Sequence, residues 1–566
     1  MASLAPNNAV LGEKYARHLL KRATFTYNQA LVRSFSSLTP AQAIDSLFEE
    51  KPLVLTLPYD PTTKTGPDGK NTGTTVDGYW TERTDVLPTF FNDFGGYQNK
   101  LSYVSAWWWF NAINTPTIKF KLSHFLSTRF VASRYGDLTV TSATSFYDHI
   151  RLLLFYSYGN YKTLARKMTL DNSMLNYLNN TNNSKTAANE NYAREFLELF
   201  TIGKGPQIGE GNYTNYTETD VVQAAKLLTG FRTKSDRTLI DTETGLPKGQ
   251  NVIANHNTTA KTFSSAFGNK VINGATTSVG MDSELNEFVE MVFSKDATAL
   301  HICRKIYRYF VRSTISAEVE NDIIAPLALE LKDNSYELMP TVKRLLNSLH
   351  FYDLDDSNST DEVIGAMVKS PIQLVSEIIT FFGGAIPDPN TLSNATAFYR
   401  TLWYGNLDFS YGVLANMQLF SPANVAGHDA YHQEPSYDKS WISSSTLVAR
   451  YRIGESLLEG KNLLRSGSPS MGVKIDIVNA LKSSGIVSQP SDAVILTTEL
   501  CAALFGQEPD LERVTYFKKA LVGDFTDNYW KLEWEKFLAN NNKSVVEPRL
   551  KELVKELLSS PEFQLF

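Results

Sequence analysis

The stretch TPAQAIDSLF, residues 39–48, decides the fold class because it carries a full set of helix-start signals. The hydroxyl of Thr39 can cap the first turn, Pro40 suits the first helical position, and Gln42 can return a hydrogen bond from the third position. The apolar residues that follow recur at helical spacing and form one face that can be buried. The stretch therefore predicts a helix that begins at Pro40.

Similar patterns occur along the rest of the chain, at 217–230, 296–310 and 546–560. Each carries apolar residues at helical spacing, and the first two also begin with a capping residue. The alternation that is typical of strands is sparse, with short candidates at 54–57 and 252–253. We therefore predict a mainly α fold: a multi-helical single body with a few short strands and long irregular loop excursions.

The chain has 566 residues, enough for two to four domains or one large body. Proline, glycine, threonine and asparagine gather at 58–77, which predicts a loop insertion, and helix signals are weak from 233 to 280. We therefore expect an amino-terminal helical portion (1–232), an irregular excursion (233–280) and a carboxyl-terminal helical portion (281–566). Because none of the connections resembles a flexible linker, we expect one compact unit.

Composition excludes several classes of protein. Hydrophobic residues make 42% of the chain and charged residues 20%, which suits a folded core and not a disordered segment. The net charge is −6, so we expect no nucleic-acid partner, and without a run of 18 apolar residues we expect no membrane span. Residues 1–10 do not form a secretory signal as written, which predicts a protein that is cytoplasmic at synthesis.

The most conspicuous polar segment is NENYAREFLELF, residues 189–200. On a helix, Glu190, Arg194 and Glu198 follow one another at i,i+4 steps and share a face, so Arg194 could hold both carboxylates. This spacing favours a structural ion-pair network. The alternative is a catalytic site assembled from these three residues with Glu195 and with His256 or His428.

The strongest candidate for a metal site is the loop GHDAYHQE, residues 427–434. It offers His428, Asp429 and His432 as possible ligands of a divalent metal, although a hydrogen-bonded contact loop explains the same residues. We expect no other cofactor, because the chain lacks phosphate-binding and dinucleotide-binding motifs.

Trp107, Trp108 and Trp109 stand in succession. They are typical of either a core helix or an aromatic surface patch, and we predict that they contribute to an interface.

Several segments, in the same order along the chain, resemble a bacterial family of unknown function, DUF1800. The resemblance runs from about residue 16 to the end. The segments are ARHLLKRATF (16–25), NENYAREFLEL (189–199), YTETDV (216–221) with LTGF (228–231), RK (304–305) with YFV (309–311), VKSP (368–371) and LLSSPEFQL (557–565).

The resemblance also implies where the family places histidines, and this chain departs from it there. The family's W-H-N-H-F segment corresponds to Leu126–Phe130, and its E-L-H-T segment to Glu198–Thr201, neither of which contains histidine. A third segment, commonly H-D-x-G-x-K-T-F, is kept in part at His256–Phe263, and the family's P-x-N-V-x-G-W corresponds to Pro422–His428. Such losses beside a kept scaffold are expected of a non-catalytic relative.

Three hypotheses follow for function. We favour a non-catalytic structural protein that self-associates as a homo-oligomer or larger assembly, since aromatic residues make 12% of the chain and suit interfaces. The first alternative is a metal-dependent or acid–base enzyme, hydrolase-like, with its site around residues 189–200. The second is a glycan or peptide binder. The resemblance leaves a secreted or surface location open.

Overall fold

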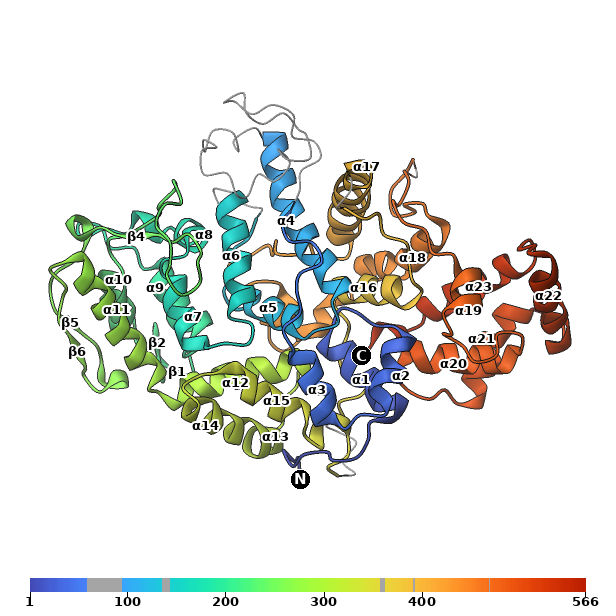
Figure 1. Ribbon diagram of the computed structural model, residues 1–566. Helices are drawn as coiled ribbons and strands as arrows, with labels where there is room; N and C mark the ends of the chain where they lie inside the picture. Colours follow the sequence, from blue (N-terminus) through green and yellow to red (C-terminus); the bar gives the residue numbers. More distant parts are fainter. Residues whose placement is uncertain (59–93, 135–142, 357–361, 390–391, 468) are drawn as a thin grey trace.

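The structure is a computed structural model that describes residues 1–58, 94–134, 143–356, 362–389, 392–467 and 469–566. It is built mainly from helices, as the sequence predicts (Figure 1). The predicted loop insertion at 58–77 lies outside the described residues, apart from Pro58.

The first half of the chain holds the following helices: α1 (Gly12–Ala23), α2 (Gln29–Ser36), α3 (Pro40–Phe48), α4 (Phe94–Asn114), α5 (Lys119–Ser127), α6 (Ala143–Phe155), α7 (Tyr161–Met168), α8 (Asn172–Tyr177), α9 (Asn191–Glu195), α10 (Glu218–Leu227) and α11 (Ser278–Phe293). The second half holds α12 (Asp296–Phe310), α13 (Ala317–Val319), α14 (Ala325–Asp333), α15 (Leu338–Leu346), α16 (Pro371–Phe381), α17 (Leu392–Thr396), α18 (Ser444–Glu459), α19 (Ile477–Ser483), α20 (Ala493–Phe505), α21 (Leu511–Val522), α22 (Asp527–Asn540) and α23 (Val546–Leu558).

Wider π turns occupy Phe196–Phe200, Glu320–Ile324 and Ala397–Gly412, and short 3-10 turns occupy Asn180–Asn182, Ile253–Asn255, Ser265–Phe267, His350–Tyr352, Asp429–Tyr431, Tyr437–Trp441 and Glu562–Gln564. In the described part of the chain the strands pair as three antiparallel ladders: β1 (Gln207–Gly209) with β2 (Asn212–Tyr213), β3 (Phe231–Arg232) with β4 (Gln250–Asn251), and β5 (Lys261–Thr262) with β6 (Val271–Ile272). The strands predicted at 54–57 and 252–253 are not formed; residues 252–253 follow β4 directly, and Ile253 begins a 3-10 turn.

The helix starts that the sequence predicts are confirmed. Helix α3 begins at Pro40, where the amide of Gln42 donates to the hydroxyl of Thr39 (3.4 Å) and the amide of Thr39 donates to the side-chain oxygen of Gln42 (3.0 Å). Helices α12 and α23 also begin where predicted, at Asp296 and Val546. Local hydrogen bonding and periodicity were therefore sufficient to locate these elements.

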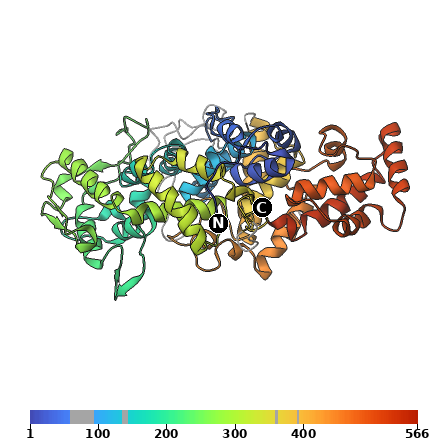
Figure 2. The same ribbon diagram turned by 90° about the horizontal axis from the view of Figure 1, so that it is seen from below.

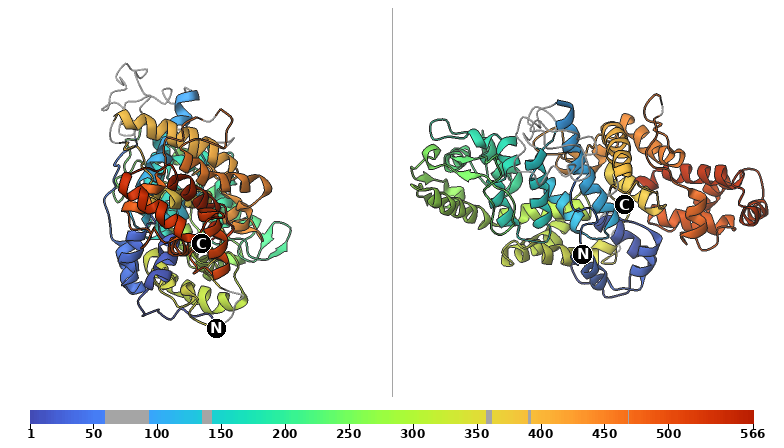
Figure 3. Two further views of the ribbon diagram at one scale, coloured as in Figure 1. Left: turned by 90° about the vertical axis from the view of Figure 1, so that its right-hand side faces the viewer. Right: turned by 45° about the horizontal axis from the view of Figure 1, so that its top comes forward.

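The molecule is elongated, with the helices and ladders of residues 160–293 at one end and helices α19 to α23 at the other (Figures 1 and 2). Helices α4, α5 and α16 lie in the middle, and the tilted view on the right of Figure 3 shows the same order. One cluster of buried apolar residues runs from Ala2 to Phe563 through all these parts. The division into three portions and the single folding unit stay predictions.

The prediction that Trp107, Trp108 and Trp109 form an interface is wrong, because the three rings are at most 1% exposed. Their indole N–H groups donate in different directions, to the carbonyl of Leu55 (2.7 Å), the hydroxyl of Ser123 (3.1 Å) and the hydroxyl of Ser376 (2.9 Å). Consecutive residues point about 100° apart on a helix, so all three can be buried only where other elements surround α4.

A buried carboxylate ties the two ends of the chain to its middle. Glu377 of α16 lies 2.9 Å from the amine of Lys369 and 3.2 Å from that of Lys21 in α1. Lys21 also donates to the carbonyl of Leu504 (2.7 Å), and Lys369 to that of Phe563 (3.0 Å). All three charged side chains are at most 1% exposed. Two cations therefore depend on one carboxylate in a place that water does not reach.

We expect the substitution Glu377→Ala to lower the free energy of unfolding by roughly 3–5 kcal/mol, because it leaves two buried lysines without their counter-charge. The matched control is Glu50→Ala, which removes a carboxylate that is 66% exposed and 2.7 Å from Lys119, and should cost less than about 1 kcal/mol. Urea unfolding followed by circular dichroism measures both. Equal losses in the two variants would contradict the role of Glu377.

Candidate functional site

The predicted ion-pair ladder in residues 189–200 forms only in part. Arg194 of α9 pairs with Glu190 (3.1 Å), as predicted, but its second partner is Glu218 of α10 (2.7 Å), not Glu198. The helix widens into a π turn over Phe196–Phe200, which turns Glu198 away from Arg194 and toward Lys204 (2.5 Å). The side chains of Arg194 and its two partners are 33–44% exposed, so the cluster is a surface ion-pair network.

Glu195 differs from its neighbours because it is only 9% exposed. Burial raises its pKa to about 7, and the nearby charge of Glu198 adds to the shift. A carboxyl group with this pKa can exchange protons at neutral pH, so Glu195 keeps the acid–base properties that the enzyme hypothesis requires.

His256 does not join this segment. Its two ring nitrogens lie 2.7 Å from the carbonyl of Thr229 and 2.9 Å from the carboxylate of Glu284, which also holds the amine of Lys261 (2.5 Å). Burial acts to raise the pKa of Glu284, but the hydrogen bonds from His256 and Lys261 outweigh it and lower the pKa. These contacts are typical of a buried structural clamp. The predicted site that combines His256 with residues 190–198 is therefore not assembled.

The loop with His428, Asp429 and His432 does not gather as a metal centre. A ring nitrogen of His432 lies 3.6 Å from a carboxylate oxygen of Asp429. The ring of His428 packs against Trp441 instead, with 5.7 Å between ring centres. Burial lowers the pKa of His428 to about 4 and also lowers that of His432. Within the described part of the chain, no three His, Cys, Asp or Glu side chains are placed to hold a metal ion together.

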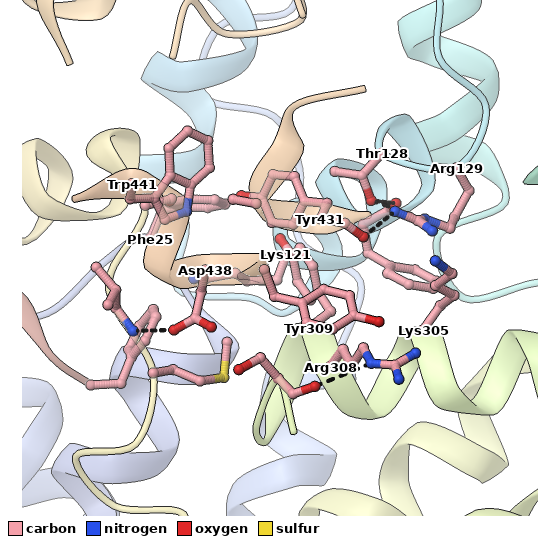
Figure 4. Close-up of a pocket in the computed structure, with 18 residues that line it drawn as sticks. Phe25, Lys121, Thr128, Arg129, Lys305, Arg308, Tyr309, Tyr431, Asp438 and Trp441 are labelled. Carbon is pink, nitrogen blue, oxygen red and sulfur yellow. Dashed lines mark hydrogen bonds between the residues drawn. The ribbon is translucent and has the colours of Figure 1, made fainter. Parts of the chain in front are cut away.

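A different set of residues lines a pocket in the middle of the molecule, which we call the cationic pocket. Its polar and aromatic lining comes from α5 and the residues after it, from α12, and from the segment 430–441. These side chains are Lys121, Arg129, Lys305, Arg308, Tyr309, Tyr431, Asp438 and Trp441. Figure 4 shows Arg129, Lys305 and Arg308 toward one end of the pocket, and Asp438 and Trp441 toward the other.

The cations of this pocket have few counter-charges. Among the described residues, the guanidinium of Arg129 donates to the hydroxyl of Thr128 (3.2 Å) and the carbonyl of Tyr431 (3.2 Å) and to no other group. Arg308 donates to a backbone carbonyl, and its nearest carboxylate is that of Glu434, 4.0 Å away and 72% exposed. Lys305 makes no hydrogen bond or ion pair with any residue that the structure describes. The pocket therefore presents positive charge that the described residues leave largely unneutralised.

Two further groups complete the pocket. The amine of Lys121 donates to the side-chain oxygen of Gln373 (2.6 Å) and lies 4.3 Å from the centre of the Phe25 ring. Asp438 is 5% exposed and accepts from the amide of Val368 (2.7 Å) through one oxygen, while its other oxygen is buried without a partner among the described residues. A buried carboxylate oxygen in this position can accept a hydrogen bond from a ligand.

Burial changes the protonation of the two lysines. It lowers the pKa of Lys121 to about 7, and it lowers that of Lys305 well below 10.5, with help from the charges of Arg129 and Arg308. Burial also lowers the pKa of Arg129, to about 10, which still leaves its guanidinium charged at neutral pH. The pocket thus combines charged guanidiniums with amines that can lose their protons.

Three of the segments that carry the family resemblance meet at this pocket, together with 126–130, where the chain departs from the family. It is lined by residues from 16–25, 126–130, 304–311 and 368–371. A model of the family described as "Protein of unknown function (DUF1800)" matches residues 18–565. The chain belongs to this family. No curated protein and no solved structure matches it.

The DUF1800 resemblance also explains what stands in place of the expected histidines. Arg129 occupies one such position and lines the pocket, and Phe200 occupies another and packs on Phe130 with 5.2 Å between ring centres. Gly427, in the segment 422–428, lies against Thr128 and Val131. Two of the three segments that correspond to histidine-bearing family motifs, 126–130 and 198–201, therefore lie close together, with Gly427 beside the first, and here they contribute cationic and aromatic side chains.

The sequence contained a signal for this site that motif analysis does not capture. Lys305, Arg308 and Tyr309 recur at i, i+3 and i+4, so they project from one face of α12. Their approach to Arg129 and Asp438 depends on contacts between segments more than a hundred residues apart.

The lowered pKa of Lys121 makes the free energy of unfolding depend on pH. The unfolded chain holds the Lys121 proton up to about pH 10.4, whereas the folded chain releases it near pH 7. Since the unfolded state binds more protons between these values, the free energy of unfolding of the wild type rises relative to that of Lys121→Met from pH 7 to pH 9. The increase is at most about 1.4 kcal/mol per pH unit.

Urea unfolding at pH 7, 8 and 9 measures this difference. The control is Lys531→Met, whose lysine is 58% exposed and should show no such trend relative to the wild type. A Lys121→Met variant whose difference from the wild type does not change with pH would contradict a lowered pKa for Lys121.

Proposed function

We propose that this DUF1800 protein binds a small acidic ligand in the cationic pocket. The observation that carries the proposal is the excess of basic side chains there, four against the single acidic side chain of Asp438 among the lining residues that the structure describes. Positive groups that are removed from water are costly unless an anion neutralises them. Guanidiniums bind carboxylate and phosphate oxygens well because their N–H groups match those oxygens in a planar fork.

The size and chemistry of the pocket limit which ligands can bind. Its cavity volume is about 40 Å³, which gives room for a few waters or for one oxyanion with a short substituent. The oxyanion would contact Arg129 and Arg308, and a hydroxyl or amine of the ligand would donate to Asp438. The rings of Tyr309, Tyr431 and Trp441, whose neighbouring centres are 6.0 and 5.7 Å apart, would cover its apolar part.

This proposal keeps the hypothesis of a ligand-binding protein but places the binding site in the cationic pocket. The sequence suggested a glycan or peptide binder that uses Trp107 to Trp109, which are buried in the core. Trp441 and the two tyrosines provide aromatic surface in their stead.

Isothermal titration calorimetry with lactate, acetate and phosphate tests the proposal. We expect at least one of these anions to bind, and the variants Arg129→Gln and Arg308→Gln to weaken its binding roughly 10- to 100-fold, because each loses a hydrogen bond to a charged group. Arg308 is partly exposed, so its variant tests the pocket even if Arg129→Gln folds poorly.

The control variant is Arg151→Gln, which removes an exposed arginine of α6 and should bind as the wild type does. Equal weakening in all three variants, or no binding of any of the three anions, would contradict the proposal.

Self-association stays a separate proposal without support from an aromatic surface at Trp107 to Trp109. Light scattering on the purified protein at high concentration tests it, and we would expect a mass above one chain, 63.4 kDa. A strictly monomeric particle would contradict the structural hypothesis while leaving ligand binding untouched.

A further inference from the structure

Lys305 differs from the other basic residues of the pocket because, among the described residues, none forms a hydrogen bond or ion pair with it. It lies on α12, one turn before Arg308, and its amine makes no hydrogen bond or ion pair with the described residues. Two other buried lysines are held in place: Lys121 of the same pocket by Gln373, and Lys369 by Glu377 and Phe563. A side chain that ends freely in a pocket can react with what enters it.

We propose that Lys305 forms an imine with the carbonyl of a short 2-oxo acid whose carboxylate is held by Arg129 and Arg308. This inference rests on the proposed function, since the same guanidiniums bind the acid. It adds a covalent step, and it narrows the ligand from acids in general to acids that carry a carbonyl next to the carboxylate.

The placement of the three groups supports that class of ligand. Lys305 and Arg308 are three residues apart on one helix, so their side chains leave the helix as neighbours. Arg129 adds a second cation close enough to lower the pKa of Lys305. If the carboxylate of the acid binds between these guanidiniums, a carbonyl on the neighbouring carbon lies next to the amine of Lys305. A carbonyl several bonds away lies beyond the reach of that amine.

The chemistry of the amine agrees with this geometry. Burial and the two neighbouring guanidiniums lower the pKa of Lys305 well below 10.5, which favours the unprotonated amine that attacks carbonyls. Lysines that form imines in enzymes are activated in the same two ways, by an apolar surrounding and by a nearby cation.

Imine formation consumes one unprotonated amine, one carbonyl group and one proton taken from solvent. The lone pair of the Lys305 nitrogen forms a bond to the carbonyl carbon, and the π electrons of the carbonyl move to its oxygen, which takes up a proton. The nitrogen loses one proton, the hydroxyl leaves as water after a further protonation, and a carbon–nitrogen double bond remains. No oxidant or reductant takes part, and the products are one protonated imine and one water.

Reductive trapping tests the inference on the full-length protein. The protein is incubated with pyruvate, reduced with sodium borohydride, digested and mapped by mass spectrometry. We expect a carboxyethyl group on Lys305 at a yield at least about tenfold above that of any other lysine. Lactate, which has the carboxylate but no carbonyl to react, should compete with pyruvate and suppress the adduct.

Two variants and one binding measurement make the result decisive. Lys305→Arg should lose the adduct, and Lys531→Arg, which changes an exposed lysine far from the pocket, should keep it. Calorimetry with lactate is run in parallel on the wild type. If lactate binds and pyruvate leaves no adduct on Lys305, the imine is overturned and the acid-binding function stands. If neither acid binds, the inference falls together with its basis. An adduct on Lys121, or one spread evenly over surface lysines, also overturns it.

Discussion

The arrangement of this protein depends on the buried carboxylate of Glu377. It joins α16 to α1 through Lys21 and to the segment before α16 through Lys369, and those lysines reach on to backbone carbonyls of α20 and of the last turn. Charges in the core are stable only when they are paired and hydrogen-bonded, so this cluster can form only when all of these segments are in place. Elements from the beginning, middle and end of the chain are thereby fixed beside the cationic pocket.

The cationic pocket also gathers basic side chains from distant segments, but it differs from the Glu377 cluster in their counter-charges. In the Glu377 cluster the described residues provide the counter-charge, whereas in the pocket no buried carboxylate among the described residues forms an ion pair with Arg129, Lys305 or Arg308. A protein tolerates such groups where a ligand or solvent can neutralise them. Both sets contain partly or fully buried cations. The Glu377 cluster holds the fold together, whereas the basic side chains of the pocket can interact with a ligand.

Sequence reasoning located the helices well and the site poorly, for reasons visible in particular residues. Thr39 and Gln42 cap their helix through contacts three residues apart, and such contacts can be inferred from spacing alone. The predicted partnership of Arg194 with Glu198 failed because a π turn changed the helical period between them. The predicted interface of Trp107 to Trp109 failed because a sequence cannot show how many neighbours surround a helix.

The sequence by itself determined the α class, the starts of α3, α12 and α23, and membership of DUF1800, because these depend on local capping, on periodicity and on motifs in order along the chain. The tertiary structure alone decided which charged residues are paired and which are free. Lys121 and Arg129, Lys305, and Asp438 come from three segments far apart in the sequence, and the lowered pKa values of the two lysines arise from burial and from nearby charges. Those are properties of packing in three dimensions, which the spacing of residues along the chain does not contain.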